Sequence, residues 1–124
     1  MKLRIDDKRP ISAIQEEFNT AFPFLKIEFF KKPHEAGEAS PIGEMLSPDS
    51  DLGRWRTNHS EGELTITKDS IVEEVESKFQ EKFGLSAQVF RKSGNVWLET
   101  SATDSWTLAE QNEQGAFMQE DVGE

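Results

Sequence analysis

The sequence contains no cysteine among its 124 residues. This absence excludes disulfide bonds, thiolate metal sites and thiol nucleophiles together. It leaves the redox compartment open, because a cytoplasmic chain and a cysteine-free secreted chain look alike. Histidine is almost as scarce. His34 and His59 lie far apart, with no second histidine at metal-ligand spacing, so a zinc site is not expected.

Long apolar runs are also missing. The N-terminal sequence MKLRIDDKRP breaks into a run of charge after five residues, whereas a signal peptide needs an apolar run of about seven residues or more. No segment approaches the roughly 20 apolar residues of a membrane-spanning helix. We therefore expect a cytoplasmic protein with no membrane segment.

Basic residues are absent from the last quarter of the chain. All 14 Lys and Arg residues lie at or before Lys92, whereas residues 93–124 carry seven acidic side chains. The formal net charge of −10 thus divides into −3 for residues 1–92 and −7 for residues 93–124. Such a field repels nucleic-acid phosphates and anionic membranes, so neither is an expected partner. It would attract a basic protein surface or a soluble cation.

Several catalytic motifs are missing too. The sequence has no G-x-S-x-G elbow, no phosphate-binding glycine loop and no H-E-x-x-H motif. Asp49-Ser50-Asp51 offers two carboxylates, but the glycine and the closing glutamate of a calcium loop do not follow, so a self-stabilised turn is favoured. We therefore lean towards a non-enzymatic protein with no cofactor and no metal.

The most informative feature that is present is an internal repeat. Residues 2–31 match residues 63–92 at a constant offset of 61. The matched pairs are mostly apolar: Leu3 and Leu64, Ile5 and Ile66, Phe18 and Phe79, Phe22 and Phe83, and Phe29 and Phe90, while Lys31 matches Lys92. A duplicated motif would keep such positions for its core.

Each copy predicts a strand, a helix and a second strand. Strict alternation at residues 2–5 and 63–66 predicts the first strand, and apolar spacings of three and four predict helices over 10–22 and 70–83. Ser70 and Glu73 have the spacing of a capping box, and Gly84 is placed to end the second helix. The closing strands, 24–31 and 85–92, differ in phase by one residue, which indicates a bulge or a one-residue slip.

More elements follow the second copy. Ser93-Gly94 predicts a hairpin into a fifth strand over residues 95–101, with Lys92 opposite Asn95, Val89 facing Leu98 and Phe90 facing Trp97. Thr107 and Glu110 form another capping box, for a helix that ends near Gly115. Residues 116–124 are expected to form a flexible acidic tail.

This order predicts an α+β fold. Two strand-helix-strand units in tandem resemble the ferredoxin-like sandwich, in which one antiparallel sheet carries both helices on one face. Residues 1–115 would form a single domain with an extra C-terminal edge strand. Residues 32–62 would be a long insert between the second and third strands, in which Ser40-Pro41 caps a helical turn.

Alternation places polar and aromatic side chains on the sheet face opposite the helices. They are Lys2, Arg4, Lys26, Glu28, Phe30, Thr65, Gln88, Phe90, Trp97 and Glu99. Exposed aromatics on a polar face are typical of protein-binding surfaces. The alternative is that Trp55, or Trp106 with Leu108, folds back over Phe90 and Trp97. RNA binding is disfavoured, because the strand after Gly62 lacks the aromatics of an RNA-recognition motif.

The insert carries a second candidate, Arg54-Trp55-Arg56. Two guanidinium groups around one indole could clamp an anion, but an amphipathic anchor with Trp55 inside and the arginines outside is favoured.

Our leading hypothesis is a non-enzymatic protein–protein interaction module that binds another protein through the open sheet face or the long loop. The candidate surface residues are Phe30, Arg54, Trp55, Arg56, Phe90 and Trp97, and the acidic C-terminal segment would tune partner choice. The alternative is a small-molecule-binding regulatory domain of ferredoxin-like type that acts as a homodimer.

Overall fold

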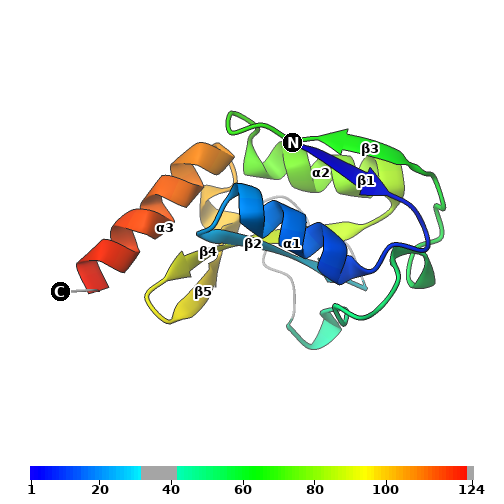
Figure 1. Ribbon diagram of the computed structural model, residues 1–124, viewed down its shortest axis with the longest axis horizontal. Coiled ribbons are helices and arrows are strands. Elements are labelled where there is room, and N and C mark those ends of the chain that lie inside the picture. Colours follow the sequence, from blue (N-terminus) through cyan, green and yellow to red (C-terminus); the bar gives the residue numbers. More distant parts are fainter. Residues whose placement is uncertain (32–41, 123–124) are drawn as a thin grey trace.

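A computed structural model describes residues 1–31 and 42–122 of the chain, with the backbone alone at Ile42 and at residues 119–122 (Figure 1). The Ser40-Pro41 cap expected from the sequence, and His34, both lie outside the described residues.

The chain forms three α-helices and two antiparallel sheets within the described residues, so the predicted α+β class is confirmed. In chain order the elements are β1 (Lys2–Ile5), α1 (Ile11–Ala21), β2 (Leu25–Phe30), β3 (Gly62–Thr65), α2 (Val72–Phe83), β4 (Ser86–Ser93), β5 (Val96–Glu99) and α3 (Leu108–Val122). Short 3₁₀ turns occur at Ile42–Glu44, Leu52–Arg54 and Ser101–Thr103.

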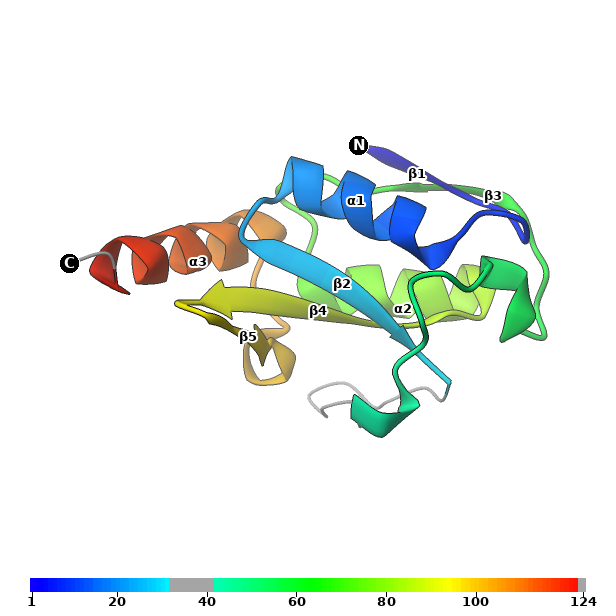
Figure 2. The ribbon, with the colours of Figure 1, turned by 60° about the horizontal axis from the view of Figure 1, so that its bottom comes forward.

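The strand pairing differs from the single ferredoxin-like sheet that the sequence predicts. β1 pairs with β3 in a two-stranded ribbon, and β2, β4 and β5 form a separate three-stranded sheet in that order. Figures 1 and 2 show α1 between the ribbon and the sheet. The reason for the error is physical: apolar alternation fixes which face of a strand is buried, but it does not choose the neighbouring strand.

The hydrophobic core lies where the helices meet the two sheets. The matched apolar residues at the first strand and helix of each copy are all buried: Leu3, Ile5, Phe18, Phe22, Leu64, Ile66, Phe79 and Phe83. At the centre, the rings of Phe29 and Phe79 meet edge to face, with centroids 5.3 Å apart. These positions form the scaffold, because each of these side chains is at most 7% exposed.

The N-terminus of α2 is not capped as predicted. The helix begins at Val72, and its first amides, from Val72 and Glu73, donate to the backbone carbonyls of Trp106 (3.0 Å) and Asp104 (2.8 Å). The Ser70 hydroxyl does not cap the helix. A backbone segment some 30 residues away thus satisfies the donors that a capping side chain would otherwise bind.

Each of the two glycines with positive φ directly follows a regular element, α2 or β4. Gly84 ends α2 at φ 62°, as predicted. Gly94 has φ 61° and opens the two-residue loop of the β4–β5 hairpin, in which Ser93 pairs with Val96. Leu98 therefore pairs with Arg91, two residues from the predicted partner. A shift of two residues leaves Leu98 on the predicted face of the sheet.

Helix α3 is longer than predicted. The Thr107 and Glu110 capping box forms, because the Glu110 amide donates to Thr107 Oγ1 at 3.1 Å and the Thr107 amide donates to Glu110 Oε1 at 3.1 Å. The helix then runs through Gly115 to Val122, so the predicted end at Gly115 is wrong. Gly115 instead permits close packing, since a Cβ there would lie 2.7 Å from Phe24 Cβ. Flexibility of residues 116–124 stays a prediction.

Candidate functional site

The predicted surface residues divide into an exposed and a buried set. Trp55 is 42% exposed, Arg54 is exposed and Trp97 is half-buried. By contrast, Phe30, Phe90 and Arg56 are only 2%, 5% and 4% exposed. The buried three cannot contact a partner in this conformation.

The sheet face that the sequence predicts to be open is largely closed. Glu28 and Gln88 are buried beside Phe30 and Phe90. The predicted members from β1 and β3 lie on the separate two-stranded ribbon. Trp106 does not cover this face, because its ring stacks on Arg91, which lies on the opposite face of the sheet. The accessible part of the predicted face is its Trp97 end.

Arg56 is a structural residue. Its Nε and Nη2 donate to Asp7 Oδ1 at 3.0 and 2.8 Å, and Nη1 donates to the carbonyls of Ser60 (2.8 Å) and Phe83 (3.1 Å). The favoured orientation is therefore wrong for two residues of the triplet, with Arg56 inside and Trp55 outside, whereas Arg54 is outside as predicted. The cause is this set of internal acceptors, which binds all three guanidinium nitrogens of Arg56.

Asp7 joins Arg56 to His59. Its second oxygen, Oδ2, lies 2.8 Å from His59 Nδ1. The hydrogen bond to His59, followed by the Arg56 guanidinium, holds the pKa of Asp7 below its usual value, while desolvation opposes the change. An aspartate–histidine pair also occurs in catalytic triads. Here the nearby Ser60 donates its hydroxyl to Asn58 Oδ1 at 2.6 Å, so that hydroxyl is already engaged.

The lowered pKa of Asp7 predicts that the stability of the fold depends on pH. Ionised Asp7 stabilises the folded state above its usual pKa, near 4, and this stabilisation is lost as pH falls through the lowered folded value. We expect Asp7→Asn to be less stable than the wild type at pH 6, and the difference to shrink at pH 3. Urea unfolding at both pH values measures it. An equal difference at both would contradict this role of Asp7.

The first exposed cluster surrounds Trp55. The Lys31 Nζ and the Arg54 guanidinium carbon lie 5.0 and 5.3 Å from the Trp55 ring centroid. Lys31 directly follows β2, and Trp55 directly follows a 3₁₀ turn of the insert. Cations at these distances are attracted by an indole face. We call Lys31, Arg54 and Trp55 the Trp55 cluster.

The second cluster surrounds Trp97 on β5. The Lys26 Nζ lies 5.1 Å from the Trp97 ring centroid and 5.2 Å from that of Phe90, and the Lys92 Nζ lies 5.8 Å from Trp97. Strand register produces this arrangement, since Lys92 pairs with Trp97 and Lys26 pairs with Phe90. We call Lys26, Lys92 and Trp97 the Trp97 cluster.

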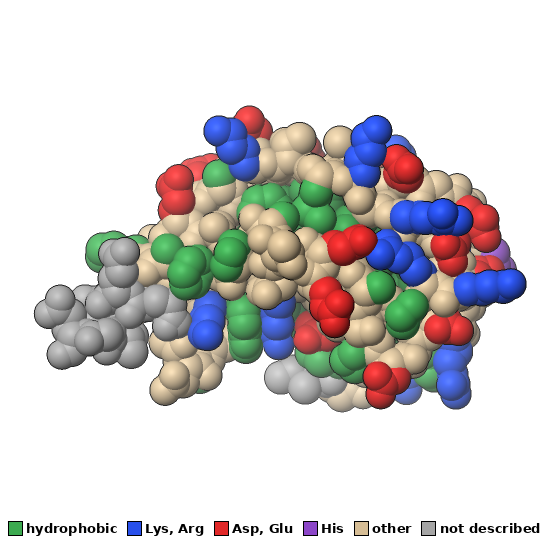
Figure 3. All heavy atoms as spheres, viewed as in Figure 1, with side chains coloured by type: hydrophobic (Ala, Val, Ile, Leu, Met, Phe, Trp, Pro, Cys, Tyr) green, Lys and Arg blue, Asp and Glu red, His purple; other side chains and the backbone are tan. Residues whose placement is uncertain are grey.

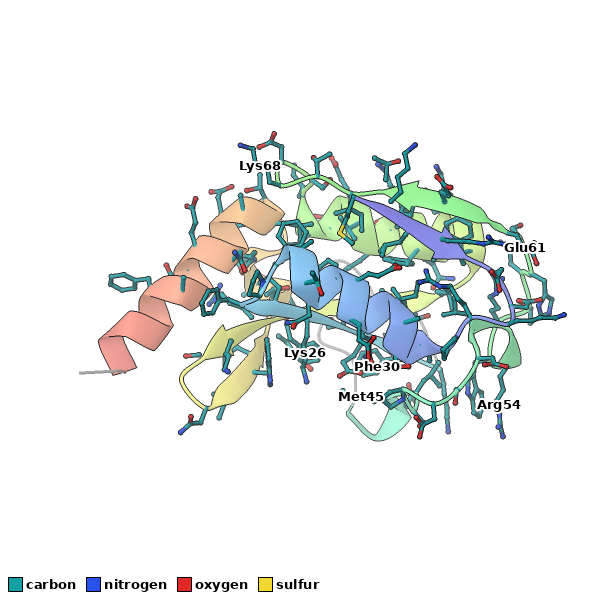
Figure 4. The ribbon with its side chains drawn as sticks, in the orientation of Figure 1. Lys26, Phe30, Met45, Arg54, Glu61 and Lys68 are labelled. Carbon is teal, nitrogen blue, oxygen red and sulfur yellow. The ribbon has the colours of Figure 1, made fainter. Side chains whose placement is uncertain are left out.

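The clusters lie along one side of the molecule. Figure 4 places Lys26 and Arg54 on its lower side, with Phe30 and Met45 between them. In Figure 3, hydrophobic side chains along the same lower edge lie next to Lys or Arg side chains, with some Asp or Glu side chains among them. The arrangement presents aromatic surface and positive charge together.

A groove of about 370 Å³ adjoins the Trp97 cluster. Its walls come from α1, β2 and β5: Ser12, Gln15, Glu16, Asn19, Lys26, Glu28 and Trp97. The Gln15 side-chain amide donates to the Ile27 carbonyl at 2.9 Å, and that of Asn19 donates to the Leu25 carbonyl at 2.9 Å. Because these amides occupy the edge carbonyls of β2, this edge is protected from pairing with another strand.

Sequence reasoning missed several of these residues. It placed Lys26 and Trp97 on one face but did not single out Lys31 or Lys92 as candidates, although these two lysines match at the offset of 61. Each now lies beside a tryptophan. Asp7 carried no usable signal, because Arg56 and His59 are 49 and 52 residues away.

The chain has no similarity on which to base an identification. No family model matches it, and no curated protein or solved structure is significantly similar to it. The described residues contain no group of three or more histidines and acids arranged to hold a metal ion. No helix in that part of the chain is long and apolar enough to cross a bilayer.

Proposed function

We propose that the protein is a non-enzymatic binding module for another protein, and that the Trp55 and Trp97 clusters form its contact surface. The observation that carries this proposal is that each tryptophan reaching this side has two cations at its ring. Tryptophan and arginine dominate the binding energy of protein interfaces, because they combine a large apolar area with fixed polar contacts.

Charge indicates the kind of surface that would bind there. Lys26, Lys31, Arg54 and Lys92 bring four cations to this side, of which Lys26 pairs with Glu28 at 3.4 Å. A partner with acidic side chains around an apolar centre complements them. The acidic residues 93–124 would repel the same partner and so favour one orientation.

We also propose that the two halves are copies of one unit. Supporting this are backbone bonds that recur in each half. The first two amides of α1 donate to the carbonyls of Ser50 and Pro48, as those of α2 donate to Trp106 and Asp104. The Leu52 amide donates to the Arg9 carbonyl, as the Leu108 amide donates to Ser70. Of the two clusters, only Lys31 and Lys92 are matched positions, because the same correspondence places Trp55 opposite Gln111 and not opposite Trp97.

Alanine substitution tests the binding proposal. We expect Trp55→Ala and Trp97→Ala each to weaken binding of the natural partner at least tenfold, since a buried interface tryptophan contributes about 2 kcal/mol or more. The partner is isolated on the immobilised wild-type protein, identified by mass spectrometry, and its dissociation constant is measured by calorimetry.

The matched control is Lys78→Ala, which removes an exposed side chain on α2. This variant should bind like the wild type, and thermal unfolding should show that all three variants remain folded. A partner that binds both tryptophan variants with wild-type affinity would refute the proposed surface.

One observation favours the alternative function, a small-molecule-binding domain. The groove beside Trp97 has polar groups on α1 and β2 and an aromatic wall, a combination typical of ligand sites. In the homodimeric form of this hypothesis, a metabolite would raise the unfolding temperature and stabilise a dimer. A monomer in sedimentation, with no thermal shift across a metabolite set, would exclude it.

A further inference from the structure

The groove beside Trp97 has one polar wall, which is a stripe of four side chains on α1. They recur at helical spacing, so they share one face of the helix. They are Ser12, Gln15, Glu16 and Asn19. Figure 2 shows α1 running alongside β2, the strand that supplies more of the lining. The stripe is about 10 Å long, so an extended small molecule or a long side chain fits along it.

Hydrogen bonds fix how the two amides of this wall are turned. Gln15 Nε2 donates to the Ile27 carbonyl at 2.9 Å and to Glu28 Oε1 at 2.8 Å. Asn19 Nδ2 donates to the Leu25 carbonyl at 2.9 Å. Oxygen and nitrogen lie on opposite sides of a side-chain amide, so Gln15 Oε1 and Asn19 Oδ1 turn away from β2. Neither oxygen accepts a hydrogen bond from another described residue. The wall therefore offers free acceptors.

The charged side chains of the groove carry one net negative charge. Two carboxylates, of Glu16 and Glu28, stand against the single ammonium of Lys26. That ammonium is already engaged, since it lies 3.4 Å from Glu28 Oε2 and 5.1 Å from the Trp97 ring centroid. The Glu16 side chain is exposed and makes no ion pair with another described residue. Its uncompensated charge favours a cation in the groove.

We propose that this groove binds a guanidinium group carried on an alkyl stem. Guanidinium is a cation whose polar atoms are all donors, held in a planar fork, and it stacks on aromatic side chains. These properties match the free acceptors, the Glu16 carboxylate and the Trp97 wall. A free guanidino compound and an arginine side chain of a protein both present this chemistry. The inference rests on the alternative function above, because it concerns the same groove, and not on partner binding by the two clusters.

The test is an NMR titration of the ¹⁵N-labelled protein with N-acetyl-arginine amide. We expect a saturable shift of the Trp97 indole signal and none for Trp55 and Trp106, because Trp97 is the tryptophan that lines the groove. The side-chain amide signals of Gln15 and Asn19 should shift with the same dissociation constant. Equal shifts of all three indole signals, or no saturable shift of the Trp97 signal, would overturn the proposal.

Two compounds of similar shape test whether guanidinium itself is recognised. N-acetyl-citrulline amide carries a neutral urea group in place of the guanidinium, and N-acetyl-lysine amide carries a compact ammonium. We expect each to bind about fivefold or more weakly than the arginine compound. Equal binding of the citrulline compound would show that charge is not recognised. Equal binding of the lysine compound would show that any cation suffices. Either result would contradict a guanidinium site.

A matched pair of charge variants locates the ligand on α1. Glu16→Gln removes the uncompensated carboxylate of the groove, whereas Glu74→Gln makes the same change at an exposed position on α2. We expect Glu16→Gln to weaken binding about threefold, as for other exposed ion pairs, and Glu74→Gln to bind like the wild type. Both side chains are exposed, so both variants should fold. Equal weakening by the two variants would show attraction to net charge alone and refute the site.

A second ligand identifies the source of the guanidinium group. It is a glycine-rich peptide with one central arginine. At least tenfold tighter binding of this peptide than of the free amide supports an arginine of a protein as the ligand, whereas equal affinities support a free compound.

Trp55→Ala separates this site from the proposed contact surface. The variant should weaken partner binding but leave the titration with N-acetyl-arginine amide unchanged, because Trp55 does not line the groove. Weaker binding of the amide to Trp55→Ala would place the ligand on the clusters and overturn the proposal.

Discussion

Replacing Phe79 with alanine should lower the free energy of unfolding by about 3–5 kcal/mol. Phe79 is fully buried, and its ring meets Phe29 edge to face at the centre of the core. The substitution removes a whole ring from close-packed surroundings that can collapse only in part. For a domain of this size, the loss corresponds to a fall in melting temperature of roughly 10–20 °C. Urea unfolding followed by circular dichroism measures the change.

The matched control is Phe117→Ala, because it makes the same chemical change at a side chain that is 60% exposed. An exposed substitution of this kind should change the free energy of unfolding by less than about 0.5 kcal/mol. Similar losses for Phe79→Ala and Phe117→Ala would show that the core is not centred on the contact between α2 and β2.

Replacing Arg56 with methionine should have the second-largest effect, a loss of about 2–4 kcal/mol. Methionine keeps much of the apolar volume but supplies no donors. The buried Arg56 guanidinium now binds Asp7 and the carbonyls of Ser60 and Phe83. Without it, these acceptors lose their bonds, and the end of α2 is no longer tied to the loop. Urea unfolding at pH 7 measures the loss.

Arg54→Met is the internal control, two residues away. Arg54 is exposed, and its contact is with the Trp55 ring. We expect a stability change of less than about 0.5 kcal/mol for it, as for other exposed contacts. If Arg54→Met destabilised the protein more than Arg56→Met, the orientation of the whole triplet would be opposite to the one described.

Local features of the fold could be predicted from the sequence, because they depend on neighbouring residues. Alternation located the strands, and spacings of three and four located α1 and α2. The Thr107 capping box formed because both of its partners lie within one helical turn. Gly84 ended α2 for a similarly local reason, its left-handed backbone conformation.

Long-range choices could not be predicted in this way. The first amides of α2 bind the backbone carbonyls of residues 104 and 106 and not the Ser70 hydroxyl. The position of these carbonyls depends on the path of the chain after β5. β2 pairs with β4, although its alternation would suit other neighbouring strands equally well. Gly115 resembles a helix end in the sequence, but here it allows α3 to cross Phe24 closely.

The candidate site shows the same limit. A charged residue beside a tryptophan is normally placed outside, so Arg56 was expected at the surface. Asp7 and the Phe83 carbonyl reverse this expectation, and both are distant in sequence. The grouping of Lys26 with Trp97 was predictable in part, because strand alternation already placed them on one face.

The most direct test of the proposed binding surface is photo-crosslinking in living cells. A photoreactive benzoylphenylalanine takes the place of Trp55, of Trp97 or, as the control, of the exposed Lys78 on α2. We predict that positions 55 and 97 crosslink to the same partner protein and that position 78 does not. No crosslink from either tryptophan position, or an equal yield from position 78, would contradict binding through these two clusters.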